Sequence, residues 1–123
     1  MQSSFLVTDD IFVVSVSGEL DHHCAGKLRE EIDEAMDAFK CRHLVMDMEK
    51  VTFMDSSGIG VVLGRYSKIS ERGGRLVLAG CSDYVEKILL MAGVFTVINK
   101  ENTAEEAIWL LRGYEQMKLG VNE

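Results

Sequence analysis

The sequence contains no proline, and its 123 residues include no low-complexity or linker-like stretch. A chain of this length without such breaks is expected to fold as a single domain over residues 1–123. No apolar run approaches the roughly 18 residues that a membrane span needs, so no contact with a membrane is expected. The first residues lack the basic patch and apolar core of a secretory signal, and we therefore expect a cytoplasmic protein.

Cysteines and basic residues are also scarce. Cys24, Cys41 and Cys81 form no Cys-x-x-Cys pair, so buried free thiols are expected rather than a disulfide framework or a zinc site. Twenty acidic residues against thirteen basic ones give a net charge of −7. Because phosphate contacts drive non-specific nucleic-acid binding, this chain is poorly suited to bind nucleic acid directly. A protein partner with a basic surface is favoured.

What the sequence does contain is an alternation of strand and helix patterns. Segments rich in β-branched and aromatic residues predict strands at 5–8, 11–17, 43–48, 75–79 and 95–98. Asp9-Asp10 makes a hairpin of the first two, and about four helices follow. Strand–helix–strand repeats imply parallel pairing with right-handed crossovers. The sequence therefore predicts an α/β fold, with a mostly parallel sheet, one antiparallel edge strand and helices on at least one face.

The predicted helices carry boundary signals and apolar stripes. Asp21 is a reasonable N-cap for the first helix, Ser82 or Asp83 for the third, and a Thr-x-x-Glu capping box at Thr103 begins the last. Gly73-Gly74 ends the second helix. The residues predicted to face inward are Leu28, Ile32, Ala35 and Phe39, then Ile59, Val62, Leu63, Tyr66 and Ile69, then Val85, Ile88, Leu89 and Ala92, and finally Ala107, Ile108 and Leu111.

The most informative stretch is Phe-Met-Asp-Ser-Ser-Gly-Ile-Gly at residues 53–60. It places Ser56 and Ser57 at the start of a predicted helix. A helix start offers free backbone N–H groups and a partial positive charge, which together favour an anion. A serine in this position can cap the helix, attack an electrophile or accept a phosphate. Spacing alone leaves the cap and the phosphate acceptor equally open.

Three other chemistries have weak support. A hydrolase elbow needs glycine where this chain has Asp55, and it needs a base, for which His22 would have to lie beside the Asp55 loop. His22-His23 with Asp21 and Asp55 could offer metal ligands, but no further ligand has a diagnostic spacing. Gly58-x-Gly60 lacks the lysine of a P-loop. No metal or cofactor is predicted.

A phosphorylated serine fits this stretch on physical grounds. Phosphate adds about −1.5 to −2 charge at pH 7, and the helix dipole favours it by up to about 1 kcal/mol when it is exposed. Asp21 and Asp55 would oppose it if they are adjacent. The fold would therefore survive modification, whereas a partner surface fitted to a neutral serine would not. Gly58 and Gly60 would let such a partner approach the backbone closely.

Two motifs in combination are specific. Gly-Glu-Leu-Asp-His-His at 18–23 and Phe-Met-Asp-Ser-Ser-Gly-Ile-Gly-Val at 53–61, followed by Leu-Gly-Arg-Tyr at 63–66, resemble the STAS-domain anti-sigma-factor antagonists, with the closest match among the sporulation members. The resemblance covers nearly the whole chain and leaves only the tail from 114 to 123 unassigned. It implies a STAS-like fold and a regulatory binding protein that is not an enzyme.

The resemblance implies partner switching. In that family the unphosphorylated antagonist binds an anti-sigma factor that is also a serine kinase, and the sigma factor is released. The kinase then uses ATP to phosphorylate the antagonist, which dissociates, and a PP2C-type phosphatase restores it. Carried over by motif position, the phosphoacceptor is Ser57, and the contacts with the kinase are Asp21, Asp55, Ser56, Gly58 and Ile59.

One alternative from a different class stays open. A STAS-like module that senses a small ligand or belongs to a scaffold would leave Ser57 unmodified. Association with a nucleotide-binding kinase favours the switch, whereas retention of a small anion without a kinase favours the alternative. For the switch, we expect phosphorylation to change the local surface and to leave the backbone nearly unchanged.

Overall fold

The computed structural model describes the backbone of residues 1–118 and the side chains of residues 1–114. Within that part the elements follow one another in an alternating order. They are β1 (Gln2–Thr8), β2 (Ile11–Leu20), α1 (Ala25–Phe39), β3 (His43–Met54), α2 (Ser56–Glu71), β4 (Leu76–Ala79), α3 (Asp83–Met91), the short 3₁₀ helix η1 (Val94–Thr96), β5 (Asn99–Glu101) and α4 (Ala104–Lys118).

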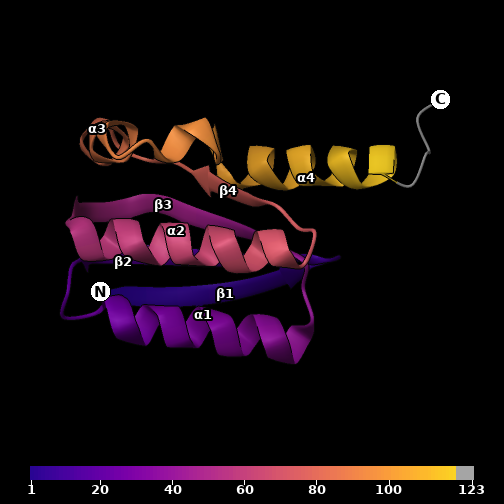
Figure 1. Ribbon diagram of the computed structural model, residues 1–123, viewed down its shortest axis with the longest axis horizontal. Helices are drawn as coiled ribbons and strands as arrows, with labels where there is room; N and C mark the ends of the chain where they lie inside the picture. Colours follow the sequence, from indigo (N-terminus) through magenta and orange to yellow (C-terminus); the bar gives the residue numbers. More distant parts are fainter. Residues whose placement is uncertain (119–123) are drawn as a thin grey trace.

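The strands form one sheet in the order β1-β2-β3-β4-β5 (Figure 1). β1 pairs with β2 in antiparallel register through a turn in which Asp9 has a positive φ of 53°. The other neighbours are parallel: β2 with β3, β3 with β4, and β4 with β5. The prediction of a mostly parallel α/β sheet with one antiparallel edge strand and four helices is confirmed.

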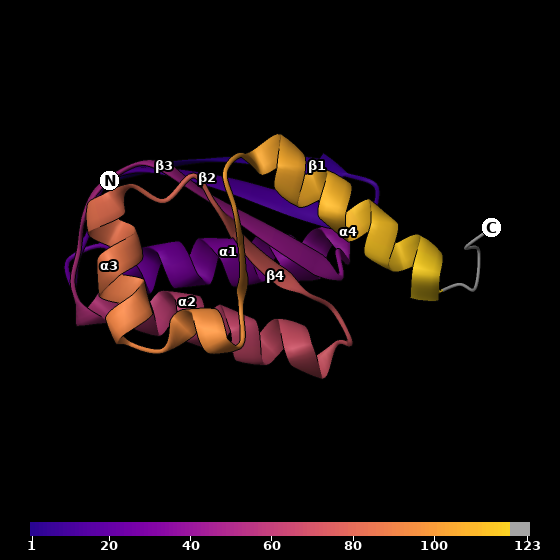
Figure 2. The ribbon, with the colours of Figure 1, turned by 90° about the horizontal axis from the view of Figure 1, so that it is seen from above.

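Helices cover both faces of the sheet. One face packs with α1, α2 and α3 around a large apolar cluster that includes Phe12, Leu44 and Met46. The other face packs with α4 through Ala107 and Leu111, which meet Val45 among others. Figure 2 shows α4 on the opposite side of the strands from α1 and α2. The alternation along β2 and β3 sends successive apolar side chains to opposite faces, which explains why these strands are almost continuously apolar.

The topology brings two loops to one end of the sheet. β2 and β3 run parallel, and their last residues, Leu20 and Met54, are partners in the register. The turn that follows Leu20 and the start of α2 that follows Met54 therefore lie next to each other. A backbone hydrogen bond from the Asp55 N–H to the Leu20 carbonyl oxygen, 3.4 Å long, joins the two loops directly. This end of the sheet carries both motifs that the sequence singled out.

Several strand boundaries differ from prediction. β1 begins at Gln2 instead of residue 5, β2 continues to Leu20 instead of ending at residue 17, and β4 begins at Leu76 instead of residue 75. β3 continues to Met54 instead of ending at residue 48.

Residues 95–98 do not form a strand, because Gly93 takes a left-handed φ of 76° and Val94 starts the 3₁₀ turn η1. The Thr96 hydroxyl donates to the Gly93 carbonyl oxygen at 2.7 Å, which closes this turn. The edge strand comes only afterwards, as β5, because Asn99 is the first partner of β4.

The first helix also begins later than expected. Cys24 is its N-cap residue, whereas Asp21 heads a turn whose carbonyl oxygen accepts the N–H groups of Cys24 and Ala25. The buried stripe of α1 consists of Leu28, Ile32 and Met36, and Phe39 in the last turn is 62% exposed. Met36 lies four residues beyond Ile32, one helical turn further on the same face, and so fills the place predicted for Phe39.

The remaining boundary signals are largely confirmed. The Ser82 hydroxyl caps α3, the Thr103 hydroxyl accepts the Glu106 N–H at the start of α4, and α2 ends just before Gly73-Gly74. In α2 the predicted Leu63 is 37% exposed, and Arg65 is buried in its place. The three cysteines are free as predicted, but only Cys41 is buried, whereas Cys24 and Cys81 are half-buried.

Candidate functional site

Asp55 is the residue on which the site is built. It is the N-cap of α2 in an extended conformation, and its Oδ1 accepts the backbone N–H groups of Ser57 at 2.8 Å and Gly58 at 3.4 Å. Its carbonyl oxygen accepts the N–H groups of Gly58 and Ile59. Three of the backbone donors in the first turn of α2 are thus satisfied by this one residue. The interpretation of Ser56 and Ser57 as mere helix caps is therefore wrong.

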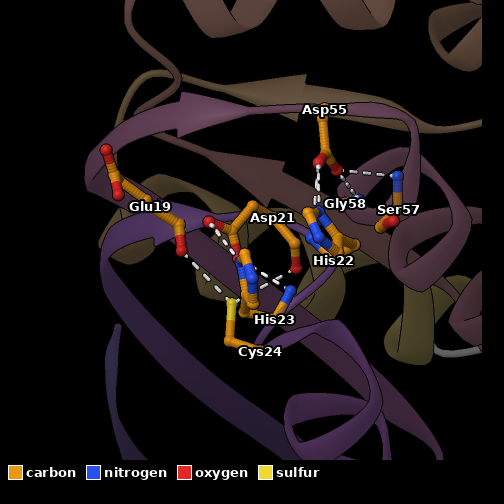
Figure 3. A network of polar contacts seen from close by, with 8 residues as sticks. All are labelled: Glu19, Asp21, His22, His23, Cys24, Asp55, Ser57 and Gly58. Carbon is orange, nitrogen blue, oxygen red and sulfur yellow. Dashed lines mark hydrogen bonds and ion pairs between the residues drawn. The ribbon is translucent and has the colours of Figure 1, made fainter.

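The second oxygen of the same carboxylate reaches the other loop. Asp55 Oδ2 accepts the backbone N–H of His22 at 3.3 Å and lies 3.7 Å from Nδ1 of the His22 ring (Figure 3). The sequence left open whether His22 lies near the Asp55 loop, and the structure places it there. Asp55 thus connects the start of α2 with the turn after β2.

That turn has its own polar contacts. Asp21 Oδ1 accepts the His23 backbone N–H at 2.9 Å, and Asp21 Oδ2 lies 3.7 Å from His23 Nδ1. The Cys24 thiol donates to the Glu19 carbonyl oxygen at 3.2 Å. The His22 and His23 rings lie 4.0 Å apart, so the two imidazoles and the two aspartates form one surface cluster, drawn in Figure 3.

Both carboxylates are held in their charged forms. Desolvation acts to raise the pKa of Asp55, but hydrogen bonds from the N–H groups of Ser57, Gly58 and His22 and from the His22 ring outweigh it, so this pKa lies below its usual value. Desolvation likewise opposes ionisation of Asp21, and hydrogen bonds and charge interactions with His23 outweigh it, so the pKa of Asp21 is also lowered. The cluster therefore presents two negative charges to a partner at neutral pH.

Ser57 lies half-buried beside this cluster. Its backbone N–H is used by Asp55, but within residues 1–118 its hydroxyl makes no hydrogen bond. A serine hydroxyl that is not engaged in the fold can be modified without loss of a structural contact. Ser56 precedes it and is exposed.

Gly58 and Ile59 differ from the exposed surface that the motif suggested. Gly58 is buried, and a Cβ atom built on it would lie 2.7 Å from Met54 Cγ and 2.9 Å from the Leu20 carbonyl oxygen. Its lack of a side chain lets α2 start directly against the end of β2. Ile59 is half-buried and packs against the core. Around Gly60 a Cβ would meet nothing within 4 Å, so this glycine does leave the backbone open.

Sequence patterns did not reveal the ionic clamp between α1 and α2. Arg65 is 7% exposed, and its Nε lies 2.9 Å from Asp33 Oδ1. Lys68 bridges Asp33 and Asp37, and Arg72 pairs with Asp37. The only signal in the sequence was an arginine among the apolar residues of the second helix. The clamp holds together the two helices that begin at the site.

The described residues offer little support for other chemistry. No group of three or more histidine, cysteine or acidic side chains among them is arranged to hold a metal ion. Within the same part of the chain, no helix has both the length and the apolar character needed to cross a bilayer. What the geometry does provide is a half-buried serine near two stabilised carboxylates.

Comparison with protein families agrees with this arrangement. The family model described as "STAS domain" matches residues 3–107, which make up most of the chain. The chain belongs to the STAS domain family. Three relatives of this STAS domain have related names. The anti-sigma F factor antagonist of Paenibacillus polymyxa is 40% identical over 88 residues, which are 72% of this chain and 75% of that protein.

The other two relatives align over longer stretches. The anti-sigma F factor antagonist of Lysinibacillus sphaericus is 33% identical over 108 residues, 88% of this STAS domain and 92% of that protein. The anti-sigma-B factor antagonist of Listeria monocytogenes is 32% identical over 100 residues, 79% and 82% of the two chains. These relatives confirm the resemblance to anti-sigma-factor antagonists.

Solved structures agree as well. The anti-sigma factor antagonist SpoIIAA in its unphosphorylated form superposes with a TM-score of 0.73 and 33% identity, over 91% of this STAS domain and 99% of that chain. SpoIIAA of Bacillus in the phosphorylated form superposes with a TM-score of 0.70 and 32% identity, over 87% and 96%. A Thermotoga maritima structure superposes with a TM-score of 0.84 at 20% identity, over 89% and 94%, and supports the fold alone.

Proposed function

We propose that this STAS domain is an anti-sigma-factor antagonist that acts in the cytoplasm and is switched by phosphorylation of Ser57. The unphosphorylated protein binds an anti-sigma factor with serine kinase activity and thereby frees a sigma factor. Phosphorylation ends the binding, and a PP2C-type phosphatase reverses it. The names of the relatives support the antagonist role, and the protein itself is a substrate rather than an enzyme.

The observation that carries the proposal is that Asp55, and not Ser57, caps α2. Asp55 caps α2, so that the Ser57 hydroxyl has no hydrogen bond within residues 1–118. A serine that capped the helix would have to break that bond before it could react. Here the hydroxyl lies at the start of a helix, half-buried but uncommitted, and this suits a phosphoacceptor.

The same cluster supports a docking surface for the kinase. Asp21 carries a stabilised negative charge in the turn after β2 and Asp55 carries another at the start of α2, where Ser56 is exposed. Arginine residues of a kinase could pair with these carboxylates, and a hydrogen bond to a charged group is worth about 1.5–3 kcal/mol. We assign Gly58 and Ile59 a supporting role in this surface, because both lie largely behind it.

The proposed reaction is an ordinary phosphoryl transfer. The Ser57 Oγ forms a bond to the γ-phosphorus of ATP as the bond to ADP breaks, and the hydroxyl proton is lost to the kinase site or to solvent. The phosphatase later hydrolyses the phosphate ester with water and returns the free hydroxyl and inorganic phosphate. This chain contributes the hydroxyl and the surface that orients it, whereas the kinase supplies ATP.

The change in charge is large enough to act as a switch. Phosphate adds about two negative charges and three acceptor oxygens to a contact fitted to a neutral serine. A loss of roughly 3–4 kcal/mol would weaken binding by two to three orders of magnitude. Refolding is not required. Both the unphosphorylated and the phosphorylated SpoIIAA structures superpose on this fold, which supports a switch confined to the surface.

The decisive experiment measures intact mass after incubation with ATP and a candidate anti-sigma kinase. Wild type, Ser57→Ala and Ser56→Ala are compared, and Ser56→Ala is the matched control because it removes the neighbouring, more exposed hydroxyl. We expect one phosphate on wild type and on Ser56→Ala, and none on Ser57→Ala.

Other outcomes would redirect the proposal. A phosphate on Ser57→Ala but not on Ser56→Ala would assign the switch to the other serine. No phosphate on any form, with a kinase shown to be active, would favour a STAS module that senses a small ligand or belongs to a scaffold.

A further inference from the structure

We propose that His22 is the intramolecular counter-ion of phosphorylated Ser57. When Ser57 carries a phosphate, the charged imidazole ring turns from Asp55 to the phosphate and holds it against the turn of residues 21–24. The inference rests on the proposed function in one respect, namely that Ser57 is the residue phosphorylated. No role of this kind follows from the motif itself.

The backbone N–H of Ser57 and the ring of His22 both lie against the carboxylate of Asp55. The Ser57 N–H donates to Asp55 Oδ1 at 2.8 Å, whereas the His22 ring lies 3.7 Å from Asp55 Oδ2. Figure 3 shows both side chains beside this carboxylate. Both residues are therefore tied to the same carboxylate, and we expect a phosphate on the Ser57 hydroxyl to come within reach of the His22 ring.

Asp55 already uses most of the backbone donors at the start of α2. The N–H groups of Ser57, Gly58 and Ile59 donate to it. Phosphate would have to displace Asp55 to use them, and the helix would then lose its cap. Asp55 also stays ionised, because its hydrogen bonds lower its pKa, and its charge repels the incoming phosphate. A positively charged hydrogen-bond donor from outside the helix would neutralise the phosphate and leave Asp55 in place as the cap.

His22 meets the requirements for such a donor. Its side chain is 69% exposed, while its backbone N–H donates to Asp55. An ordinary histidine titrates at about pH 6.5 and the second proton of phosphoserine at about pH 6, so the two groups can share a proton near neutral pH.

The charged groups next to His22 are carboxylates. Asp55 lies beside it at the start of α2, and Asp21 precedes it in the same turn. The neighbouring imidazole of His23 is not equivalent, because it lies 3.7 Å from Asp21 Oδ2 and is paired on that side of the turn. Addition of phosphate raises the local negative charge further. His22 is thus the imidazole placed to pair with phosphorylated Ser57, and His23 provides the matched control.

The test uses the full chain with phosphoserine installed genetically at position 57, so that no kinase is needed. The titration of the phosphate is followed by ³¹P NMR in the wild-type background and in His22→Gln, His23→Gln and His22→Lys. Because an opposite charge favours the ionised phosphate, we expect the wild-type phosphate to titrate about 1 pH unit below that of His22→Gln. His22→Lys restores the lower midpoint, and His23→Gln leaves it nearly unchanged.

A second readout follows the ring itself. In ¹H–¹⁵N spectra of the imidazoles, the His22 titration midpoint should move to higher pH when residue 57 is phosphorylated, and that of His23 should move less. Equal phosphate midpoints in wild type and His22→Gln, or an equal effect of His23→Gln, would overturn the proposal. Failure of this proposal is distinguishable from failure of the proposed function, because a kinase that ignores Ser57 in the mass experiment would not alter the NMR titration.

Discussion

Gly58 lies so close to Leu20 that no side chain fits between them. A Cβ at Gly58 would come within 2.9 Å of the Leu20 carbonyl oxygen and 2.7 Å of Met54 Cγ. The first of these atoms belongs to the backbone of β2 and cannot move aside on its own. This contact seats the start of α2 on the sheet and thereby places Ser57 beside the turn that carries His22.

A pair of glycine substitutions tests this contact. Gly58→Ala is expected to lower the free energy of unfolding by about 1–3 kcal/mol, because the added methyl group overpacks the junction. Gly60→Ala in the same helix turn meets nothing within 4 Å and is expected to be neutral or to stabilise by about 0.5–1 kcal/mol. Urea unfolding measures both. Equal effects of the two substitutions would contradict the packing argument.

Removal of the Asp55 side chain should have two separate consequences. Asp55→Ala is expected to destabilise the protein more than Ser82→Ala, which removes the single-bond cap of α3 and should cost about 1 kcal/mol. Only Asp55→Ala also releases the turn that carries His22, so only it should slow phosphorylation of Ser57. Urea unfolding and timed intact-mass measurements distinguish the two effects. A slow reaction in Ser82→Ala as well would indicate a general loss of stability.

The lowered pKa of Asp55 predicts how stability depends on pH. Because the folded state binds this proton less tightly than the unfolded chain, the contribution of Asp55 is complete above the ordinary carboxyl pKa of about 3.9 and is lost as the pH falls through the lower folded value. Asp55→Asn removes the titration. The stability difference between wild type and Asp55→Asn should be constant from about pH 7 to 5 and should shrink below about pH 4. A difference that stays constant as the pH falls below about 4 would contradict the assignment.

Periodicity and turn chemistry predicted most of the fold. Alternating strand and helix signals were sufficient for the parallel sheet, and polar caps such as Ser82 and Thr103 fell where expected. The errors occurred where tertiary packing overrides local preference. Val97 and Ile98 are β-branched, yet the left-handed Gly93 and the burial of Val94 and Ile98 beneath the helices produce a 3₁₀ turn there.

The site was predicted in part. The motif marked Ser57 and Asp55, and the alternation of strands and helices implied that the two loops could meet. The roles within the site were not readable from spacing. Asp, Ser and Ser are all good N-cap residues, so only the folded structure shows that Asp55 takes the cap and leaves Ser57 uncommitted. Likewise, the buried position of Gly58 depends on Leu20, which is distant in sequence.

The clamp between α1 and α2 gives a last prediction. Asp33→Asn leaves the guanidinium of Arg65 buried without its counter-ion, and Nη1 of Arg65 already has no hydrogen-bond partner within the described residues. We expect the free energy of unfolding to fall by about 1–3 kcal/mol. Arg65→Met should be milder, because it removes the buried charge together with its desolvation cost.

Lys68→Met is the control for this clamp. Lys68 is more exposed than Arg65 and lies 3.7 Å from the same Asp33 oxygen, so its loss should change stability by no more than about 1 kcal/mol. If Lys68→Met destabilises as much as Asp33→Asn in urea unfolding, the clamp depends on the summed charge of the helix pair. If Asp33→Asn alone is severe, the buried Arg65 pair sets how α1 and α2 are held, and with them the two loops of the site.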